Sequence, residues 1–131
     1  MAILEGMHIL VVDDEDEVRD LLADILTENG HQVETASDGS QGIEMFKKND
    51  YDLVFTDLGM PGMSGWQVAE KIKNINRKTP VAIITGWNVE LKESEMRERG
   101  VNLIVNKPFK VNQVLNLVQE GMKLRERFEA A

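Results

Sequence analysis

Carboxylate side chains directly follow two short apolar runs, each of the length of a buried strand. Asp13 and Asp14 come after His8–Val12, and Asp57 comes after Leu53–Thr56. Carboxylates without histidine or cysteine suit Mg²⁺, which takes few protein ligands and keeps several waters. If these strands end at one edge of a sheet, the three carboxylates repel one another unless a cation lies between them. The pattern therefore predicts a Mg²⁺ (or Mn²⁺) site.

Two further apolar runs end in side chains of different chemistry. Thr85 follows Val81–Ile84, and Lys107 lies two residues after Val105, the last residue of the run VNLIV. A carboxylate beside a metal ion and an ammonium suits a phosphoryl acceptor, because the cations offset charge that develops on the transferred oxygens. The hydroxyl can donate to one of those oxygens. The strand ends therefore favour phosphoryl transfer to one of the carboxylates.

The elements that must position these side chains alternate between strands and helices. Each apolar run is followed by a segment with helical spacing, and the pairs Asp38/Gln41 and Ser64/Gln67 predict helix N-termini. Gln32–Ala36 is less apolar and is expected at an edge. We expect an α/β fold: a doubly wound, flavodoxin-like, five-stranded parallel sheet of strand order 2-1-3-4-5 with five helices. Such folds bind ligands at the carboxyl ends of their strands.

The predicted helices differ in their apolar content. The helix expected over Asp16–Asn29 has a full apolar face, formed by Val18, Leu21, Leu22, Ile25 and Leu26. The helix expected between Asn88 and Arg99 has few apolar residues, and weak anchoring makes it a candidate moving element.

A long last helix is expected from Val111, with a stripe at three- and four-residue steps: Val114, Leu117, Gly121, Leu124 and Phe128. The stripe predicts either ordinary packing or a dimer seam. No core is evident for residues 122–131 to cover. We therefore divide the chain into an N-terminal extension (1–6), one domain (7–121) and a helical extension or linker stub (122–131).

Length and composition limit the class of protein. The 131 residues suit one domain, and the net charge of −8 disfavours direct nucleic-acid binding. The absence of cysteine excludes disulfides and thiolate metal sites. No apolar run is long enough to span a membrane, and the N-terminus lacks a signal-peptide pattern. We expect a cytoplasmic protein, as a monomer or weak homodimer.

Four motifs in order resemble the receiver domain of two-component response regulators. They are VVDDE at Val11–Glu15, TDLGMPGMSG at Thr56–Gly65, ITG at Ile84–Gly86, and NKPF at Asn106–Phe109. With the alternation of strands and helices, the resemblance covers about residues 7–121. It implies a signalling switch that accepts a phosphoryl group from a phosphohistidine on a histidine kinase or phosphotransfer protein. An unidentified downstream protein would then recognise an altered face formed by the fourth helix, the fifth strand and the fifth helix.

The resemblance also implies roles for individual residues. Asp57 is the expected phosphoacceptor, with Thr85 and Lys107 contacting the phosphoryl group. The expected metal ligands are Asp13, Asp14, Asp57 and the backbone carbonyl of Gly59. A cis peptide bond is expected before Pro108. Gly86 would leave the acceptor open to a partner.

Three positions near the site depart from the family pattern or modulate it. Ile104 stands where the family often has an aromatic residue that moves inward on activation, so coupling is expected to rest on the fourth helix. Trp87 is expected either at the rim of the pocket, where it would slow loss of phosphate, or merely over the start of that helix. Lys110 is a poor N-cap, so the last helix is expected to begin in a different way.

Three other functions were weighed. A phosphatase of the haloacid dehalogenase type uses an aspartyl phosphate, but it needs a second aspartate where Gly59 stands, and a cap domain. A flavodoxin-like cofactor binder needs a phosphate-binding first loop, which the acidic segment Asp13–Glu17 would oppose. An interaction module with an inactive site remains the third. We expect a protein that catalyses only its own phosphorylation and dephosphorylation, and no external turnover.

Overall fold

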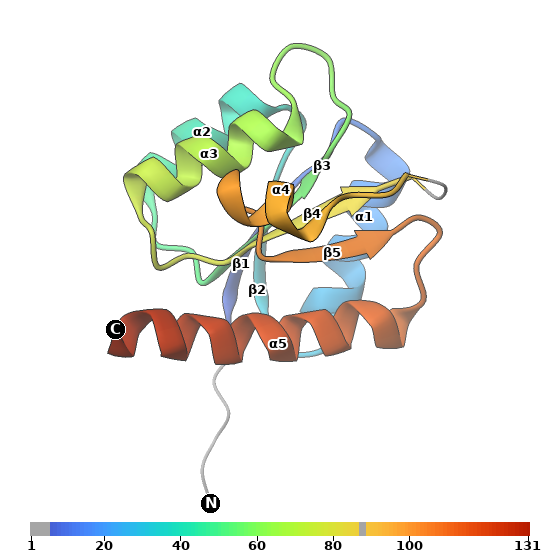
Figure 1. Cartoon of the computed structure of the whole chain (residues 1–131). Helices are drawn as coiled ribbons and strands as arrows, with labels where there is room; N and C mark the ends of the chain where they lie inside the picture. Colours follow the sequence, from blue (N-terminus) through green and yellow to red (C-terminus); the bar gives the residue numbers. More distant parts are fainter. Residues whose placement is uncertain (1–5, 87–88) are drawn as a thin grey trace, which may run out of the picture.

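A single parallel sheet forms the centre of the molecule. The computed structural model describes residues 6–86 and 89–131. Its strands lie in the order β2-β1-β3-β4-β5, which confirms the predicted topology (Figure 1). The strands are β1 (His8–Val12), β2 (Gln32–Ala36), β3 (Leu53–Asp57), β4 (Val81–Thr85) and β5 (Leu103–Asn106).

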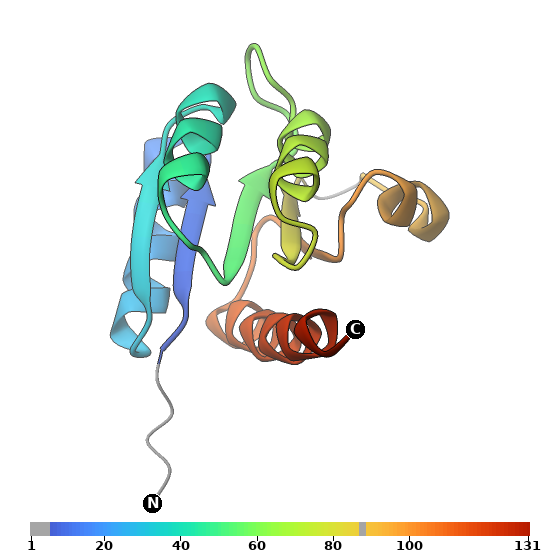
Figure 2. The same ribbon diagram turned by 90° about the vertical axis from the view of Figure 1, so that its left-hand side faces the viewer.

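Helices cover both faces of this sheet. They are α1 (Asp16–Glu28), α2 (Gly39–Lys48), α3 (Gly65–Ile75), α4 (Glu93–Glu98) and α5 (Val111–Ala130). In Figure 1, α2 and α3 lie on the opposite side of the sheet from α5. Figure 2 shows α1 (blue) and α2 (teal) on opposite sides of β1 and β2. This two-sided cover explains why the central strands are continuous apolar runs.

The core is divided by the sheet into two apolar clusters. One joins α1 and α5 to the sheet and contains Leu22, Phe55 and Val118, while the other joins α2 and α3 to it and contains Phe46 and Ile72. Every residue of β3 and of β4 is buried. Both strands therefore hold their last residues in fixed positions.

The predicted helix starts of α2 and α3 are confirmed. The Asp38 side chain accepts a hydrogen bond from the Gln41 backbone N–H, 2.8 Å away. Ser64 and Gln67 form a reciprocal capping box at the start of α3. Lys110 precedes α5, and its backbone N–H donates to Gln113 Oε1 at 2.7 Å. That contact allows α5 to begin at Val111 although lysine is a poor cap.

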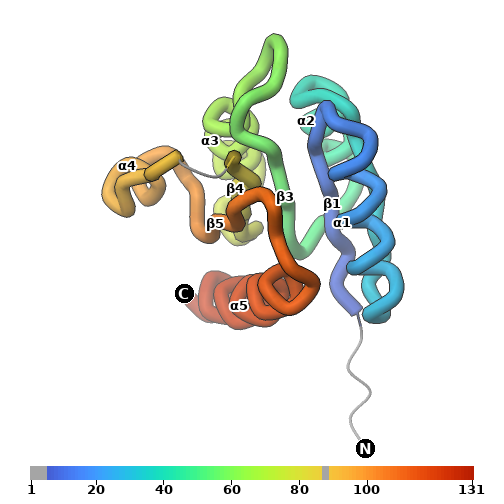
Figure 3. The backbone as a smooth tube through the Cα atoms, turned by 90° about the vertical axis from the view of Figure 1, so that its right-hand side faces the viewer, coloured from blue at the N-terminus to red at the C-terminus, as the bar shows by residue number. Residues whose placement is uncertain are grey.

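The fourth helix is much shorter than predicted. It spans Glu93–Glu98 rather than Asn88–Arg99, and it buries none of its residues. Its N-cap residue is Lys92, so the helix begins later than the predicted start near Asn88, a residue that lies outside the described residues. Too few apolar side chains are available to hold more turns against the sheet. Figure 3 shows α4 at the side of the molecule farthest from α1.

Strand boundaries shift by one or two residues from the predicted ones. β3 and β4 each continue by one residue, so Asp57 and Thr85 belong to the strands themselves. β5 begins at Leu103 instead of Val101. Val101 N–H donates to Met96 O at the end of α4, so this residue is used to close the helix instead.

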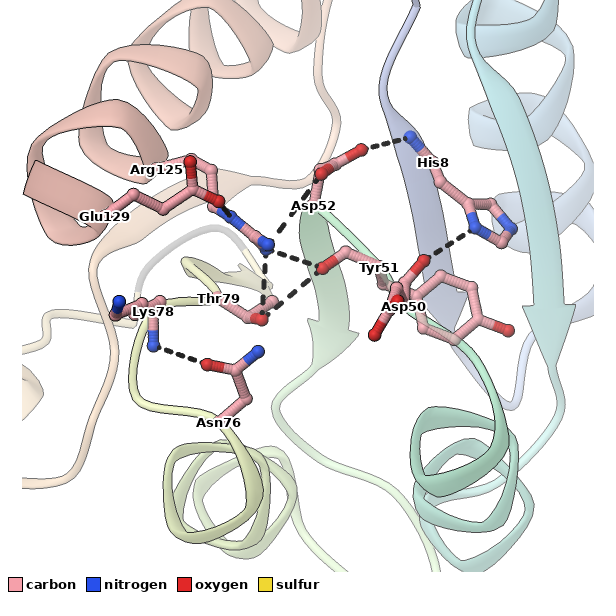
Figure 4. Close-up of polar contacts among 9 residues, drawn as sticks. All are labelled: His8, Asp50, Tyr51, Asp52, Asn76, Lys78, Thr79, Arg125 and Glu129. Atoms are coloured by element: carbon pink, nitrogen blue, oxygen red, sulfur yellow. Dashed lines mark hydrogen bonds and ion pairs between the residues drawn. The ribbon is translucent and has the colours of Figure 1, made fainter.

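The end of α5 does have a surface to cover, contrary to expectation. Met122 and Leu124 pack against the first core cluster. Arg125 Nη1 donates to the Tyr51 carbonyl at 2.9 Å and to Thr79 Oγ1 at 3.4 Å (Figure 4). The helix therefore continues along the amino ends of β3 and β4 without a break at residue 121, while the proposed division into domain and linker stays a prediction.

Among the residues that the structure describes, no helix combines the length and apolar character needed to cross a membrane.

Candidate functional site

Three carboxylates meet at the carboxyl ends of β1 and β3. Ligand atoms of Asp13, Asp14 and Asp57 all lie within 4.8 Å of one another. The parallel register pairs Val12 with Thr56, which brings the residues that follow side by side. Asp13 is fully buried and Asp57 is 5% exposed, whereas Asp14 is exposed. The structure therefore brings the three predicted carboxylate ligands together, with one of them open to solvent.

Lys107 lies opposite this cluster, in the loop after β5. Its Nζ is 3.3 Å from Asp57 Oδ1 and 3.6 Å from Asp13 Oδ2. Its backbone N–H donates to the Thr85 carbonyl at 2.7 Å, which fixes the loop to the end of β4. The Lys107–Pro108 peptide bond is cis, as predicted.

Two buried oxygens of the site have no hydrogen-bond partner among the described residues: Asp13 Oδ2 and Thr85 Oγ1. Buried polar atoms are normally satisfied, so each such atom indicates a missing ligand or water. An oxygen-only cluster with an unsatisfied carboxylate oxygen fits Mg²⁺. The unsatisfied hydroxyl fits an acceptor oxygen that arrives with a ligand.

Burial and mutual repulsion alter the acidity of the cluster. Burial, then the charge of Asp13, raises the pKa of Asp57 to about 6, against the opposing effect of Lys107. Burial also raises the pKa of Asp13. For Lys107, burial alone would lower the pKa, but the hydrogen bond to Glu15 and the charges of Asp13 and Asp57 raise it overall. The Lys107 ammonium is therefore held in its charged form. Any added cation would stabilise the ionised form of Asp57.

Local contacts hold the two loops that carry these residues. Asp13 Oδ1 accepts from Glu15 N–H at 2.9 Å, and the Asp13 carbonyl accepts from Arg19 Nη1 at 2.8 Å. On the other side, Gly65 packs so closely that a Cβ there would collide with the Asp57 carbonyl oxygen. Glycine at the start of α3 thus lets the helix approach the end of β3.

The remaining predicted positions surround the cluster. Gly59 is exposed two residues after Asp57, and Gly86 is exposed after Thr85, where a Cβ would meet open space. Ile104 is half-buried in β5 and pairs with Ile83 of β4. Trp87 lies outside the described residues, and its role stays a prediction.

Sequence reasoning missed two features of the site. The first is Glu15, whose Oε1 makes the shortest contact to Lys107, at 2.7 Å. The second is Leu21, which was assigned to the buried face of α1 but is 49% exposed. An apolar groove of about 440 Å³ includes it and opens beside the site; its lining residues are Val18, Leu21, Gly86, Lys107, Pro108 and Phe109. The excess of apolar residues on α1 was the available signal.

This fold and this site define a class of protein: a flavodoxin-like domain with an acidic cluster and a lysine at the carboxyl edge of its sheet. Residues 9–119 match the family described as the response regulator receiver domain. The chain belongs to that family, whose members act in two-component signal transduction.

Individual relatives support this assignment. The chain is 32% identical over 111 residues to the transcriptional regulatory protein TcrA of Mycobacterium tuberculosis, covering 85% of this chain and 44% of TcrA. It is 33% identical over 122 residues to the sensor histidine kinase RcsC of Escherichia coli, covering 91% of this chain and 13% of RcsC. The chain thus spans less than half the length of these relatives.

A solved structure matches the whole domain. The receiver domain of NtrX from Brucella abortus is 31% identical and superposes with a TM-score of 0.82, covering 88% of this chain and 98% of that one. The similarity therefore extends over a complete receiver domain.

Proposed function

We propose that this domain is a phosphoacceptor switch in which Asp57 takes a phosphoryl group from the phosphohistidine of a histidine kinase or phosphotransfer protein. The observation that carries the proposal is the Lys107 ammonium, 3.3 Å from Asp57 Oδ1, beside three clustered carboxylates. Membership of the receiver family supports it.

The transfer step needs little from the protein beyond placement and charge. An Asp57 oxygen attacks phosphorus, and the P–N bond of the phosphohistidine breaks with its electron pair left on the imidazole nitrogen. The carboxylate gives up no proton, and the imidazole departs neutral if its other nitrogen is protonated. Lys107 and the Thr85 hydroxyl would donate to the transferred oxygens.

Asp13, Asp14, Asp57 and the Gly59 carbonyl would hold Mg²⁺ (or Mn²⁺), which supplies positive charge beside the transferred oxygens. Asp57 reacts as the carboxylate, and its raised pKa of about 6 leaves it mainly ionised at neutral pH. Asp57 therefore acts as the nucleophile without a separate base.

The apolar groove beside Lys107 is the surface we assign to the phosphodonor. It borders Gly86 and Lys107, so a protein seated there brings its histidine to the open side of Asp57. Exposed apolar side chains such as Leu21 favour an apolar helix face as its partner.

The response is proposed to reach the α4–β5–α5 face, where an unidentified downstream protein would read it. The short α4, which buries none of its residues, supports displacement of this element. When α4 is displaced, the Ile104 side chain on β5 would shift with it, although Ile104 lacks the hydroxyl of an aromatic switch residue. We further propose a cytoplasmic monomer or weak homodimer without direct nucleic-acid contact and without external enzymatic turnover.

The test is the intact mass of the protein after incubation with acetyl phosphate, with and without Mg²⁺. We expect one phosphoryl adduct on the wild type that requires the metal and is absent from Asp57→Asn. Equal labelling of Asp57→Asn at the same rate would refute the assignment, and no labelling of the wild type would indicate an interaction module.

A further inference from the structure

Glu15 directly follows the two aspartates of the proposed metal site, yet its side chain turns to Lys107. It occupies the N-cap position of α1, but its carboxylate accepts no hydrogen bond from the first turn. Its Oε1 instead lies 2.7 Å from Lys107 Nζ, across 92 positions of the chain. The Glu15 side chain thus contacts Lys107 in the site, whereas an N-cap side chain usually accepts a hydrogen bond from the first turn of its own helix.

Glu15 is the nearest of three carboxylates around the ammonium. Asp57 Oδ1 and Asp13 Oδ2 are farther from Lys107 Nζ, at 3.3 and 3.6 Å. Both aspartates are buried at strand ends, whereas 59% of the Glu15 side chain is exposed. Exposed ion pairs are weak and easily broken. Glu15 is therefore the partner that Lys107 can exchange most readily.

A phosphoryl group on Asp57 would compete with Glu15 for the same N–H groups. Both are anionic, and both need the ammonium at hydrogen-bond distance. While Glu15 holds Lys107, the contact to Asp57 stays longer than a normal charge-assisted hydrogen bond. The Thr85 hydroxyl, the other proposed donor to the phosphoryl group, has no hydrogen-bond partner among the described residues.

We propose that Glu15 is a positioning residue that restrains the Lys107 ammonium before phosphorylation and is displaced when the phosphoryl group arrives. The inference rests on the proposed function and names Glu15 as a residue that influences the rate at which Asp57 is phosphorylated. Lys107 keeps its three protons throughout, and the bonds that form and break are those of the transfer to Asp57.

The test compares Glu15→Gln with Glu17→Gln, which removes the same charge from an exposed position in the first turn of α1. We measure the labelling rate with acetyl phosphate at saturating Mg²⁺, and the apparent Kd for beryllofluoride, a phosphoryl mimic. Glu15→Gln should label faster and bind the mimic more tightly, by roughly three- to fivefold. Glu17→Gln should match the wild type.

A double-mutant cycle with Lys107→Ala shows whether Glu15 acts through Lys107. The gain from Glu15→Gln should disappear in the Lys107→Ala background. A gain that persists there, no gain in the wild-type background, or a tenfold loss of Mg²⁺ affinity in Glu15→Gln would each overturn the inference. The proposed function fails separately, if wild-type Asp57 is not labelled at all.

Discussion

At the scale of single residues, Asp57 combines burial with unfavourable charge. Its carboxylate is 5% exposed, and Asp13 and Asp14 lie beside it. A charge placed there costs folding free energy unless it is compensated. In the absence of a metal, the ionised carboxylate of Asp57, the proposed acceptor, is therefore expected to lower the free energy of unfolding.

This cost predicts a pH dependence of stability. The pKa of Asp57 is raised to about 6 from an ordinary value of 3.8, so the folded state binds an extra proton between these pH values. Its contribution to the free energy of unfolding therefore falls as pH rises from about 4 to 6. Above pH 6, without metal, we expect Asp57→Asn to be more stable than the wild type by roughly 1–3 kcal/mol.

The measurement is urea unfolding in EDTA from pH 4 to 8. Asp24→Asn is the matched control, because Asp24 is exposed on α1, and it should follow the wild-type profile. If Asp57→Asn is less stable than the wild type at pH 7.5, this account of the site is incorrect.

At the scale of elements, α5 is joined to the sheet by a polar contact as well as by its apolar stripe. Arg125 bonds the Tyr51 carbonyl and Thr79 Oγ1 at the amino ends of β3 and β4, and its Nη1 is 4.0 Å from Asp52 Oδ1. Thr79 is fully buried. Removing the guanidinium would therefore leave buried polar groups poorly satisfied.

We expect Arg125→Ala to lower the free energy of unfolding by about 1–3 kcal/mol. Arg127→Ala, on the exposed face of the same helix turn, should change it by less than about 0.5 kcal/mol. Urea unfolding measures both. Equal effects of the two variants would show that Arg125 does not anchor the helix.

The fourth helix should be the least protected of the helices described. It has six residues, no side-chain cap and no buried residue, whereas α3 has a capping box and three buried apolar side chains. Amide exchange should be fast across residues 93–98 and slow across 68–75.

On addition of beryllofluoride, the largest change in amide exchange should fall between residues 86 and 100. A change confined to residues 101–110 would argue against coupling through α4.

At the scale of the whole molecule, the acidic cluster lies beside an apolar groove, so the proposed chemistry and the proposed docking surface share one side. Leu21→Ser should leave stability and acetyl phosphate labelling unchanged, because Leu21 is 49% exposed and does not belong to the acidic cluster. Transfer from any phosphohistidine protein that labels the wild type should slow by about tenfold.

Ile75→Ser provides the comparison, since Ile75 is 44% exposed at the end of α3, outside the groove. Phosphotransfer rates to the three proteins are measured by intact mass. Equal slowing by both substitutions, or none by Leu21→Ser, would remove the groove as the docking surface.

Much of this architecture follows from sequence pattern alone. Continuous apolar runs such as Leu53–Thr56 identify buried parallel strands, and the capping pairs Asp38/Gln41 and Ser64/Gln67 locate helix starts, because these are local preferences of the chain. The sequence pattern also predicts that Asp13, Asp57 and Lys107 lie close together, because parallel strands bring their carboxyl ends to one edge of the sheet.

Other features depend on contacts that no local pattern encodes. The Glu15–Lys107 pair joins residues 92 positions apart. The 49% exposure of Leu21 depends on how other elements pack against α1, which the apolar spacing of the helix does not reveal. α4 is short and buries none of its residues, and only Met96 of this helix packs against the core. The end of α5 is held because Arg125 donates hydrogen bonds to the Tyr51 carbonyl and the Thr79 hydroxyl, in the segments that precede β3 and β4. Local spacing determined which elements form and which edge carries the chemistry, whereas only long-range packing decided which side chains are buried, paired or left free to move.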